Sequence, residues 1–189
     1  MTNMPDHVAR ARHERVTIAD YDPKWPIRFA EEATHLRQCL PAGLIGRIEH
    51  FGSTAVPGLS AKPIIDMMIE IPTLEEVTSR VAPILRAQGY EYFWRPRAAH
   101  DPRPAYTWFI KREASGRRTH HLHFLEPGAP DWNRLAFRDY LIAHPALARE
   151  YDALKRRIAA EHPDDRIAYA RAKTAFIERV NALARDAPG

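Results

Sequence analysis

The sequence predicts an α+β fold, in which a mixed sheet flanked by helices is followed by C-terminal helices. The short apolar runs typical of strands all lie before residue 127, whereas the pattern from Trp132 onward is helical, with breaks at two His-Pro pairs. The last two predicted strands are joined by the tight turn ASGRR, as in a hairpin. That connection argues against a doubly wound parallel sheet.

The predicted elements follow from these patterns in chain order. Strands are predicted at 16–22, 44–52, 63–71, 90–94, 105–112 and 119–126. Helices are predicted from Trp25 onward and at 74–88, 132–143, 146–161 and 165–185. The run 63–71 is apolar almost throughout, which is typical of a central strand covered on both faces. The 189 residues are therefore expected to form a flexible tail over 1–15, a core over 16–130 and a helical region packed on the core over 131–189.

Composition excludes several classes of protein. A net charge of +4 would tolerate anionic partners, but no basic stripe with interleaved aromatics is present, which argues against a nucleic-acid partner. No apolar run reaches 18 residues and the N-terminus has no apolar signal core, so no membrane partner is expected. The single cysteine, Cys39, excludes an intramolecular disulfide and fits a reducing, cytoplasmic location. The sequence does not indicate an oligomeric state.

A loop after the second predicted strand carries residues suited to phosphate. Gly52 lets the backbone turn sharply and present N–H groups, and the hydroxyls of Ser53 and Thr54 lie beside them. A second glycine, Gly58, allows another turn, and Lys62 adds a cation. The alternative is an ordinary turn, but a second glycine, a lysine and a buried aspartate within fifteen residues favour a functional loop.

Asp66 lies in the middle of the apolar run, where an ionised carboxylate is costly unless it is paired or binds a metal. Asp66 is therefore a candidate functional residue; the alternative is that it caps a loop or pairs with an arginine. Strand periodicity places Asp66, Met68 and Glu70 on one face. Glu70 lies about 13 Å along the strand from Asp66, too far for both to bind one ion without a bend.

Two histidines in the run THHLHFLE share a strand face. His121 and His123 are two residues apart, and this spacing can place both imidazoles on one transition metal. With Asp66 they would form a site suited to zinc, manganese or iron. The alternative, that the histidines form hydrogen bonds or bind phosphate as imidazolium, stays open. His50, just before the loop, could complete either arrangement.

The segment HFGSTAVPGLSAKPIIDMMI resembles the signature of the GrpB (UPF0157) family, a branch of the nucleotidyltransferase superfamily. The resemblance continues through VTIADYDPKW, THHLHFLEPGAPDW, LAFRDYLIAHP and the C-terminal YARAKTAFI, and so covers nearly the whole chain from Val16 to Leu183. It implies a minimal nucleotidyltransferase core followed by helices.

The superfamily pattern implies a Gly-Ser loop, then Asp-x-Asp or Asp-x-Glu on a strand, with the acids holding two divalent cations. Gly52, Ser53 and Asp66 match this pattern, but Met68 stands where the second acid belongs. The resemblance thus implies a catalytic role for Asp66. A thioether is a poor ligand for magnesium. The implied cofactor is a divalent metal (Mg, Mn or Zn), and the missing acid argues against ordinary two-metal transfer.

The resemblance also draws attention to residues of the C-terminal helices. Tyr169 and Lys173 are four residues apart on one helix face, and with Lys155 they could hold a triphosphate or a base. Arg138 could contact phosphate or pair with an acid. Solvated lysines and a packing tyrosine are the alternative.

Two functions remain open from the sequence. The first is a nucleotidyltransferase-like enzyme that binds a nucleotide or phosphorylated small molecule and transfers or hydrolyses a nucleotidyl or phosphoryl group. The second is a module that binds the same ligand without turnover. The family resemblance, rather than any motif of this sequence, also implies an accessory role linked to coenzyme A. The loss of the second acid leaves the enzymatic assignment uncertain.

Overall fold

The computed structural model describes residues 14–97 and 104–186, which belong to two compact units. One unit, the sheet unit, comprises Pro23–Gly52 and Ile64–Trp132. The other, the helical unit, comprises the chain up to Asp22, Ser53–Pro63 and the chain from Asn133. The predicted core over 16–130 and helical region over 131–189 stay a prediction, because compactness does not establish which parts fold independently. Most of the predicted tail lies outside the described residues.

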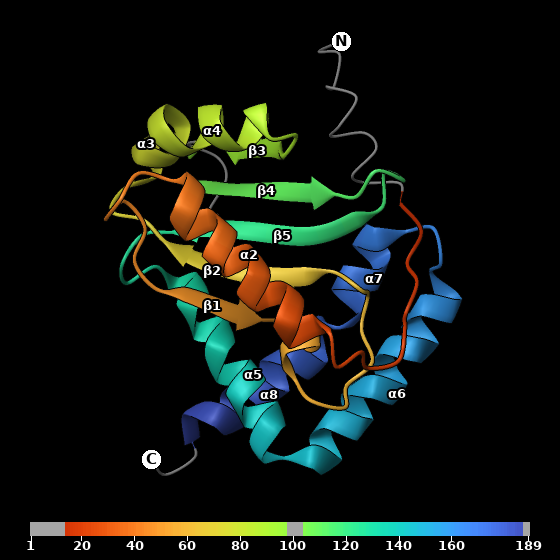
Figure 1. The fold of residues 1–189 in the computed structure, drawn as a ribbon. Coiled ribbons are helices and arrows are strands. Elements are labelled where there is room, and N and C mark those ends of the chain that lie inside the picture. Colours follow the sequence, from red (N-terminus) through yellow and green to blue (C-terminus); the bar gives the residue numbers. More distant parts are fainter. Residues whose placement is uncertain (1–13, 98–103, 187–189) are drawn as a thin grey trace. The chain divides into compact units, whose positions relative to one another are not determined.

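The sheet unit is built on a five-stranded mixed sheet with the order β1-β2-β5-β4-β3 (Figure 1). The strands are β1 (Ile48–Phe51), β2 (Ile65–Glu70), β3 (Glu91–Arg95), β4 (Tyr106–Arg112) and β5 (Arg118–Leu125). Only β2 and β5 run parallel; the other neighbours are antiparallel. The predicted α+β class with a mixed sheet is confirmed.

Strand β2 occupies an inner position between β1 and β5, as its apolar sequence predicts. Met67, Met68 and Ile69 are fully buried, whereas Asp66 and Glu70 are partly exposed. The strand is therefore covered on both faces except where it carries its two acids.

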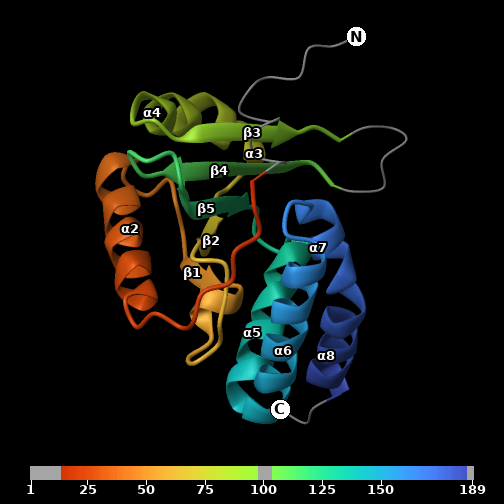
Figure 2. The same ribbon diagram turned by 90° about the vertical axis from the view of Figure 1, so that its right-hand side faces the viewer.

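Helix α2 (Trp25–Cys39) lies along one face of the sheet (Figure 2). The predicted helix 74–88 begins as expected, since the Thr73 hydroxyl accepts a hydrogen bond from the Glu76 amide. It is not continuous, however: α3 (Leu74–Glu76) passes into a π-helical turn at Val77–Val81 and then into α4 (Ala82–Ala87). Pro83 has no N–H to continue the α-helical pattern here, which is a common reason for such a shift.

The helical unit contains α5 (Arg134–Ala143), α6 (Pro145–Glu161), α7 (Arg166–Ala172) and α8 (Thr174–Asp186). The predicted breaks at the two His-Pro pairs are confirmed, but the single predicted helix 165–185 is divided at Lys173. The Lys173 amide donates to the Ala170 carbonyl, three residues back, and so tightens the end of α7. The core of α5, α6 and α8 includes Leu141, Tyr151 and Val180.

The predicted strand 16–22 is wrong. The segment makes a single bridge, between Ala19 and Ala61, and the Val16 amide donates to the carbonyl of Pro163. A single bridging pair does not form a ladder of paired residues, so this segment is not a strand although its sequence alternates. Within 14–97 and 104–186, no helix combines the length and the apolar character needed to cross a membrane.

Candidate functional site

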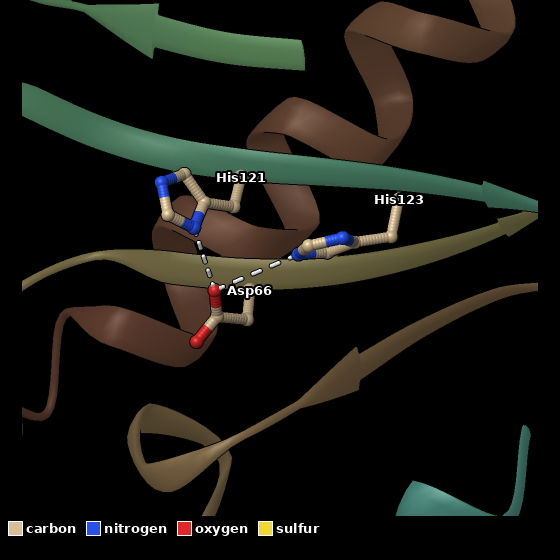
Figure 3. A group of neighbouring side chains, drawn as sticks. All are labelled: Asp66, His121 and His123. Carbon is tan, nitrogen blue, oxygen red and sulfur yellow. Dashed lines mark ion pairs between the residues drawn. The ribbon is translucent and has the colours of Figure 1, made fainter. Parts of the chain in front are cut away.

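The register of β2 against β5 brings together Asp66, His121 and His123. Asp66 pairs with His121, and Met68 pairs with His123. Since side chains two residues apart share a strand face, both histidines project on the side of Asp66 (Figure 3). One donor atom from each of the three residues lies within 4.8 Å of the others.

The distances fit a single small cation. His121 Nδ1 lies 3.2 Å and His123 Nε2 3.9 Å from Oδ1 of Asp66. Nitrogen and oxygen ligands of one zinc ion are about 2 Å from the metal and therefore about 3–4 Å from one another. The Asp66 side chain is 30% exposed, so solvent reaches the cluster.

The charges of Asp66 and His121 suit metal ligation. Burial raises the pKa of Asp66, but the contacts with His121 and then His123 lower it more, so the pKa of this carboxyl lies well below its usual range. Burial lowers the pKa of His121 to about 4, although Asp66 opposes that shift. At neutral pH an ionised carboxylate therefore faces a neutral imidazole.

Two further residues contact the outer ring nitrogens, and the sequence did not point to either. The Tyr106 hydroxyl lies 2.7 Å from His123 Nδ1, and Arg118 Nη1 lies 2.9 Å from His121 Nε2. A partner that accepts a hydrogen bond from the outer N–H, as the Tyr106 hydroxyl can, orients an imidazole in a metal site. Tyr106 is on β4 and its proximity depends on strand pairing, whereas Arg118 lies three residues before His121, which in a regular strand would put it on the opposite face.

Gly52 has a structural role beside Asp66. Its φ is +73°, and a Cβ atom at this position would lie 2.7 Å from Oδ2 of Asp66. Both conditions favour glycine. Ser53 and Thr54, which follow it, begin a short 3₁₀ helix (Ser53–Ala55), in which Thr54 is buried; their predicted phosphate contacts stay a prediction.

The second acid of the superfamily pattern has no substitute beside Asp66 in 14–97 or 104–186. Met68 is fully buried, and Glu70 accepts a hydrogen bond from Arg47 at 3.1 Å. The cluster therefore offers one carboxylate and two imidazoles. This donor set fits one ion such as Zn²⁺ or Mn²⁺ better than two Mg²⁺ ions, which prefer oxygen.

Several predicted phosphate ligands gather in the helical unit around Tyr169, which is buried. The Nζ atoms of Lys173 and Lys62 lie 4.5 Å and 5.5 Å from the centre of its ring. Lys155 is 1% exposed, and its ammonium donates to the Ser60 carbonyl. Burial lowers the pKa of Lys155 to about 7.

Two other candidates make contacts of a different kind. Arg138 forms an ion pair with Asp139 at 2.7 Å, which is the alternative that the sequence left open. His50 stacks on Phe29 of α2, with ring centres 4.8 Å apart, and faces away from Asp66 because its neighbour Phe51 is the residue that pairs with Asp66.

Comparison with known proteins supports the resemblance. A family model described as GrpB protein matches residues 15–182. A UPF0157 protein of Pseudomonas aeruginosa is 40% identical over 174 residues, which cover 91% of this chain and 69% of that protein. The protein YqkA of Bacillus subtilis is 38% identical over 172 residues, and the match spans 90% of this chain but only 48% of YqkA.

A solved structure and a longer protein are also similar. The crystal structure of the conserved protein GrpB from Enterococcus faecalis superposes with a TM-score of 0.76 at 35% identity, covering 89% of this chain and 96% of that one. A dephospho-CoA kinase of Mycolicibacterium paratuberculosis is 31% identical over 179 residues, which cover 84% of this chain and 43% of the kinase. The family model spans most of the chain, and the Pseudomonas aeruginosa relative is 40% identical to it, so the chain belongs to the GrpB family.

Proposed function

We propose that the chain binds one divalent transition metal through Asp66, His121 and His123, and with it a nucleotide or another phosphorylated small molecule, for nucleotidyl or phosphoryl transfer. The observation that carries this proposal is the convergence of three donor atoms within 4.8 Å on a partly exposed face of the sheet. A bound ion would supply Lewis-acid polarisation of a phosphoryl oxygen.

The residues around the cluster support the same assignment. Asp66 remains anionic and His121 neutral near pH 7, so neither has to lose or gain much charge before binding a cation. The Tyr106 hydroxyl can accept a hydrogen bond from Nδ1–H of His123, which leaves the lone pair of Nε2 directed at the ligand position.

The lysines of the helical unit give independent support for an anionic ligand. Lys62 and Lys173 place two ammonium groups near the ring of one buried tyrosine, Tyr169, and both lysines are only partly buried. Groups of this kind bind phosphate as point charges. We propose that this cluster contacts phosphate.

A second candidate function is a binding module without turnover. It is favoured by Met68, which replaces a carboxylate on which two-metal transfer depends and which is fully buried. The similarity to part of a dephospho-CoA kinase makes dephospho-coenzyme A one reasonable ligand to test, in an accessory role.

Thermal-shift measurements of metal-free protein test the proposal. Zn²⁺, Mn²⁺ and Mg²⁺ are each added alone, and then with the four nucleoside triphosphates or dephospho-coenzyme A. Zn²⁺ or Mn²⁺ is expected to raise Tm in the wild type and to lose most of this effect in Asp66→Asn. The control Asp186→Asn removes the same charge at an exposed helix end and should respond like the wild type.

The outcomes separate the candidates. Equal stabilisation of wild type and Asp66→Asn would remove the cluster as the metal site, and no shift with any phosphorylated ligand would exclude the ligand class tested. If a nucleotide binds, a radiolabelled transfer assay distinguishes the enzyme from the module.

A further inference from the structure

Both ring nitrogens of His121 have close polar neighbours. Nδ1 faces Oδ1 of Asp66 at 3.2 Å, and Nε2 faces Nη1 of Arg118 at 2.9 Å. A neutral imidazole carries one proton, so it can donate at one nitrogen and must accept at the other. The two neighbours therefore determine which nitrogen carries the proton.

Only one proton position satisfies both contacts. A guanidinium has donors and no acceptor, and it stays protonated in proteins. Nε2 of His121 must accordingly accept from Arg118, which leaves the proton on Nδ1, where it is donated to the Asp66 carboxylate. A proton on Nε2 would set two N–H groups against each other.

We infer that Arg118 is a positioning residue that holds the proton of His121 on Nδ1 and so opposes metal coordination at that nitrogen. Nδ1 is the nitrogen directed at Asp66 (Figure 3). A metal ion at this position must bind the lone pair of Nδ1. The proton of the imidazole then lies on Nε2, and Arg118 must move away from that nitrogen. The consequence for metal binding rests on the proposed function, whereas the proton position does not.

The strand pairing explains how Arg118 reaches His121. Ile110 of β4 pairs with His121 and Arg112 pairs with Arg118, so two steps along β4 oppose three steps along β5. The register shift between Lys111 and Arg112 thus puts Arg118 on the face of His121. Arg118 is 6% exposed, so its guanidinium has little freedom to leave this position.

His123 provides an internal comparison. Its outer nitrogen, Nδ1, faces the Tyr106 hydroxyl at 2.7 Å. A hydroxyl can donate or accept, so it permits either tautomer. Of the two imidazoles, only that of His121 is held in the tautomer that opposes metal binding at the nitrogen beside Asp66.

Side-chain ¹⁵N NMR of metal-free protein tests the proton position directly. Resonances of His121 are assigned by their loss in His121→Asn. In the wild type, Nδ1 is expected to be protonated and Nε2 unprotonated. Arg118→Gln should give a mixture of tautomers, because an amide can donate or accept, whereas Arg118→Lys, which can only donate, should resemble the wild type. A proton on Nε2 of the wild type, or no change in Arg118→Gln, would overturn the inference.

Calorimetric titration with Zn²⁺ tests the consequence. Arg118→Gln is expected to bind Zn²⁺ about tenfold more tightly than the wild type. The control Arg117→Gln removes the same charge one residue away, from an exposed side chain that contacts Glu113, and should change affinity much less. Equal gains in both variants would mean that charge alone acts, and would refute the positioning role.

The two experiments separate the inference from the proposed function. If no variant binds Zn²⁺ while NMR shows the expected proton on Nδ1, the metal proposal fails and the role of Arg118 in setting the tautomer stands. If Zn²⁺ binds through Asp66 but the wild-type proton is on Nε2, the positioning role fails alone.

Discussion

Two carboxylates of the sheet unit sit in contrasting surroundings. Glu32 of α2 is 3% exposed; it accepts a hydrogen bond from Tyr90 at 2.5 Å and forms an ion pair with the Lys111 ammonium. Asp66, on the opposite face, is 30% exposed and lies against two imidazoles. The charge of Glu32 is thus neutralised inside the protein, whereas that of Asp66 faces the neutral imidazole of His121 and a solvent-accessible position that suits a cation.

The comparison separates a structural acid from a candidate functional one. A buried carboxylate that is paired with a cation and accepts a hydrogen bond from a hydroxyl has its charge compensated, and removing it would destabilise the fold by leaving the cation unpaired. A partly exposed carboxylate among metal-ligating side chains has no cation to compensate its charge, which costs folding free energy and is typical of functional sites. Adjacent residues of β5 illustrate this: His120 lies on the side of Lys111, with which it pairs, and His121 on that of Asp66.

The largest effect is expected for Glu32→Gln. The change removes the charge that neutralises Lys111 while keeping the shape of the side chain, and should lower the free energy of unfolding by about 3 kcal/mol. Urea denaturation measures this. Glu31→Gln, an exposed position of the same helix, should change stability by less than about 0.5 kcal/mol; similar losses in both would contradict a structural role for Glu32.

Gly52→Ala should disturb Asp66 as well as stability. Gly52 and Gly43 have nearly equal φ values, +73° and +72°, but only at Gly52 would a Cβ meet Asp66, at 2.7 Å. Each alanine is expected to cost about 1–2 kcal/mol in backbone strain. Gly52→Ala should cost about 1 kcal/mol more and weaken Zn²⁺ binding. Equal effects of both variants in denaturation and titration would show that the contact with Asp66 is unimportant.

Tyr106→Phe tests the environment of His123. Losing the hydroxyl that contacts Nδ1 should reduce Zn²⁺ affinity about tenfold, measured by competition with a chelator. Tyr92→Phe removes a hydroxyl that contacts Thr78 instead, at 2.9 Å, and is the matched control. A larger loss in the control would contradict the proposed role of Tyr106.

Lys155 extends the comparison to a buried charge of the helical unit. Burial lowers its pKa from 10.5 to about 7, so between these values unfolding takes up a proton and stability should rise with pH. The slope approaches about 1.4 kcal/mol per pH unit. In Lys155→Met this pH dependence should vanish, whereas Lys24→Met, at an exposed position, should retain it. Denaturation at pH 7, 8 and 9 measures the free energy of unfolding of each variant. Identical slopes against pH in the two variants would refute the lowered pKa of Lys155.

Periodicity predicted the fold and the central cluster well. The alternation of β5 placed His121 and His123 on one face, and the apolar run of β2 identified an inner strand carrying Asp66; the register confirms that they meet. The strand predicted at 16–22 failed because an alternating run does not show whether a partner strand exists. The predicted helix 165–185 is divided into α7 and α8 by the hydrogen bond from the Lys173 amide to the Ala170 carbonyl, which the spacing of apolar residues does not predict.

The surroundings of the cluster could not be predicted. Arg118 reaches His121 only because of the register shift opposite Lys111, and a one-residue irregularity in pairing has no clear signature in a single sequence. Tyr106 depends on long-range pairing of the same kind. The role of Gly52 as the residue that leaves room for Asp66 became apparent only from the close approach of the two strands.

X-ray absorption at the zinc edge, on protein loaded with one equivalent of Zn²⁺, most directly tests the claim that Asp66, His121 and His123 bind a metal. We predict two imidazole nitrogens at about 2.0 Å with oxygen completing the shell, one imidazole in His123→Asn, and an unchanged spectrum in the exposed control His144→Asn. A shell that keeps both imidazoles in His123→Asn, or that contains none in the wild type, would contradict it.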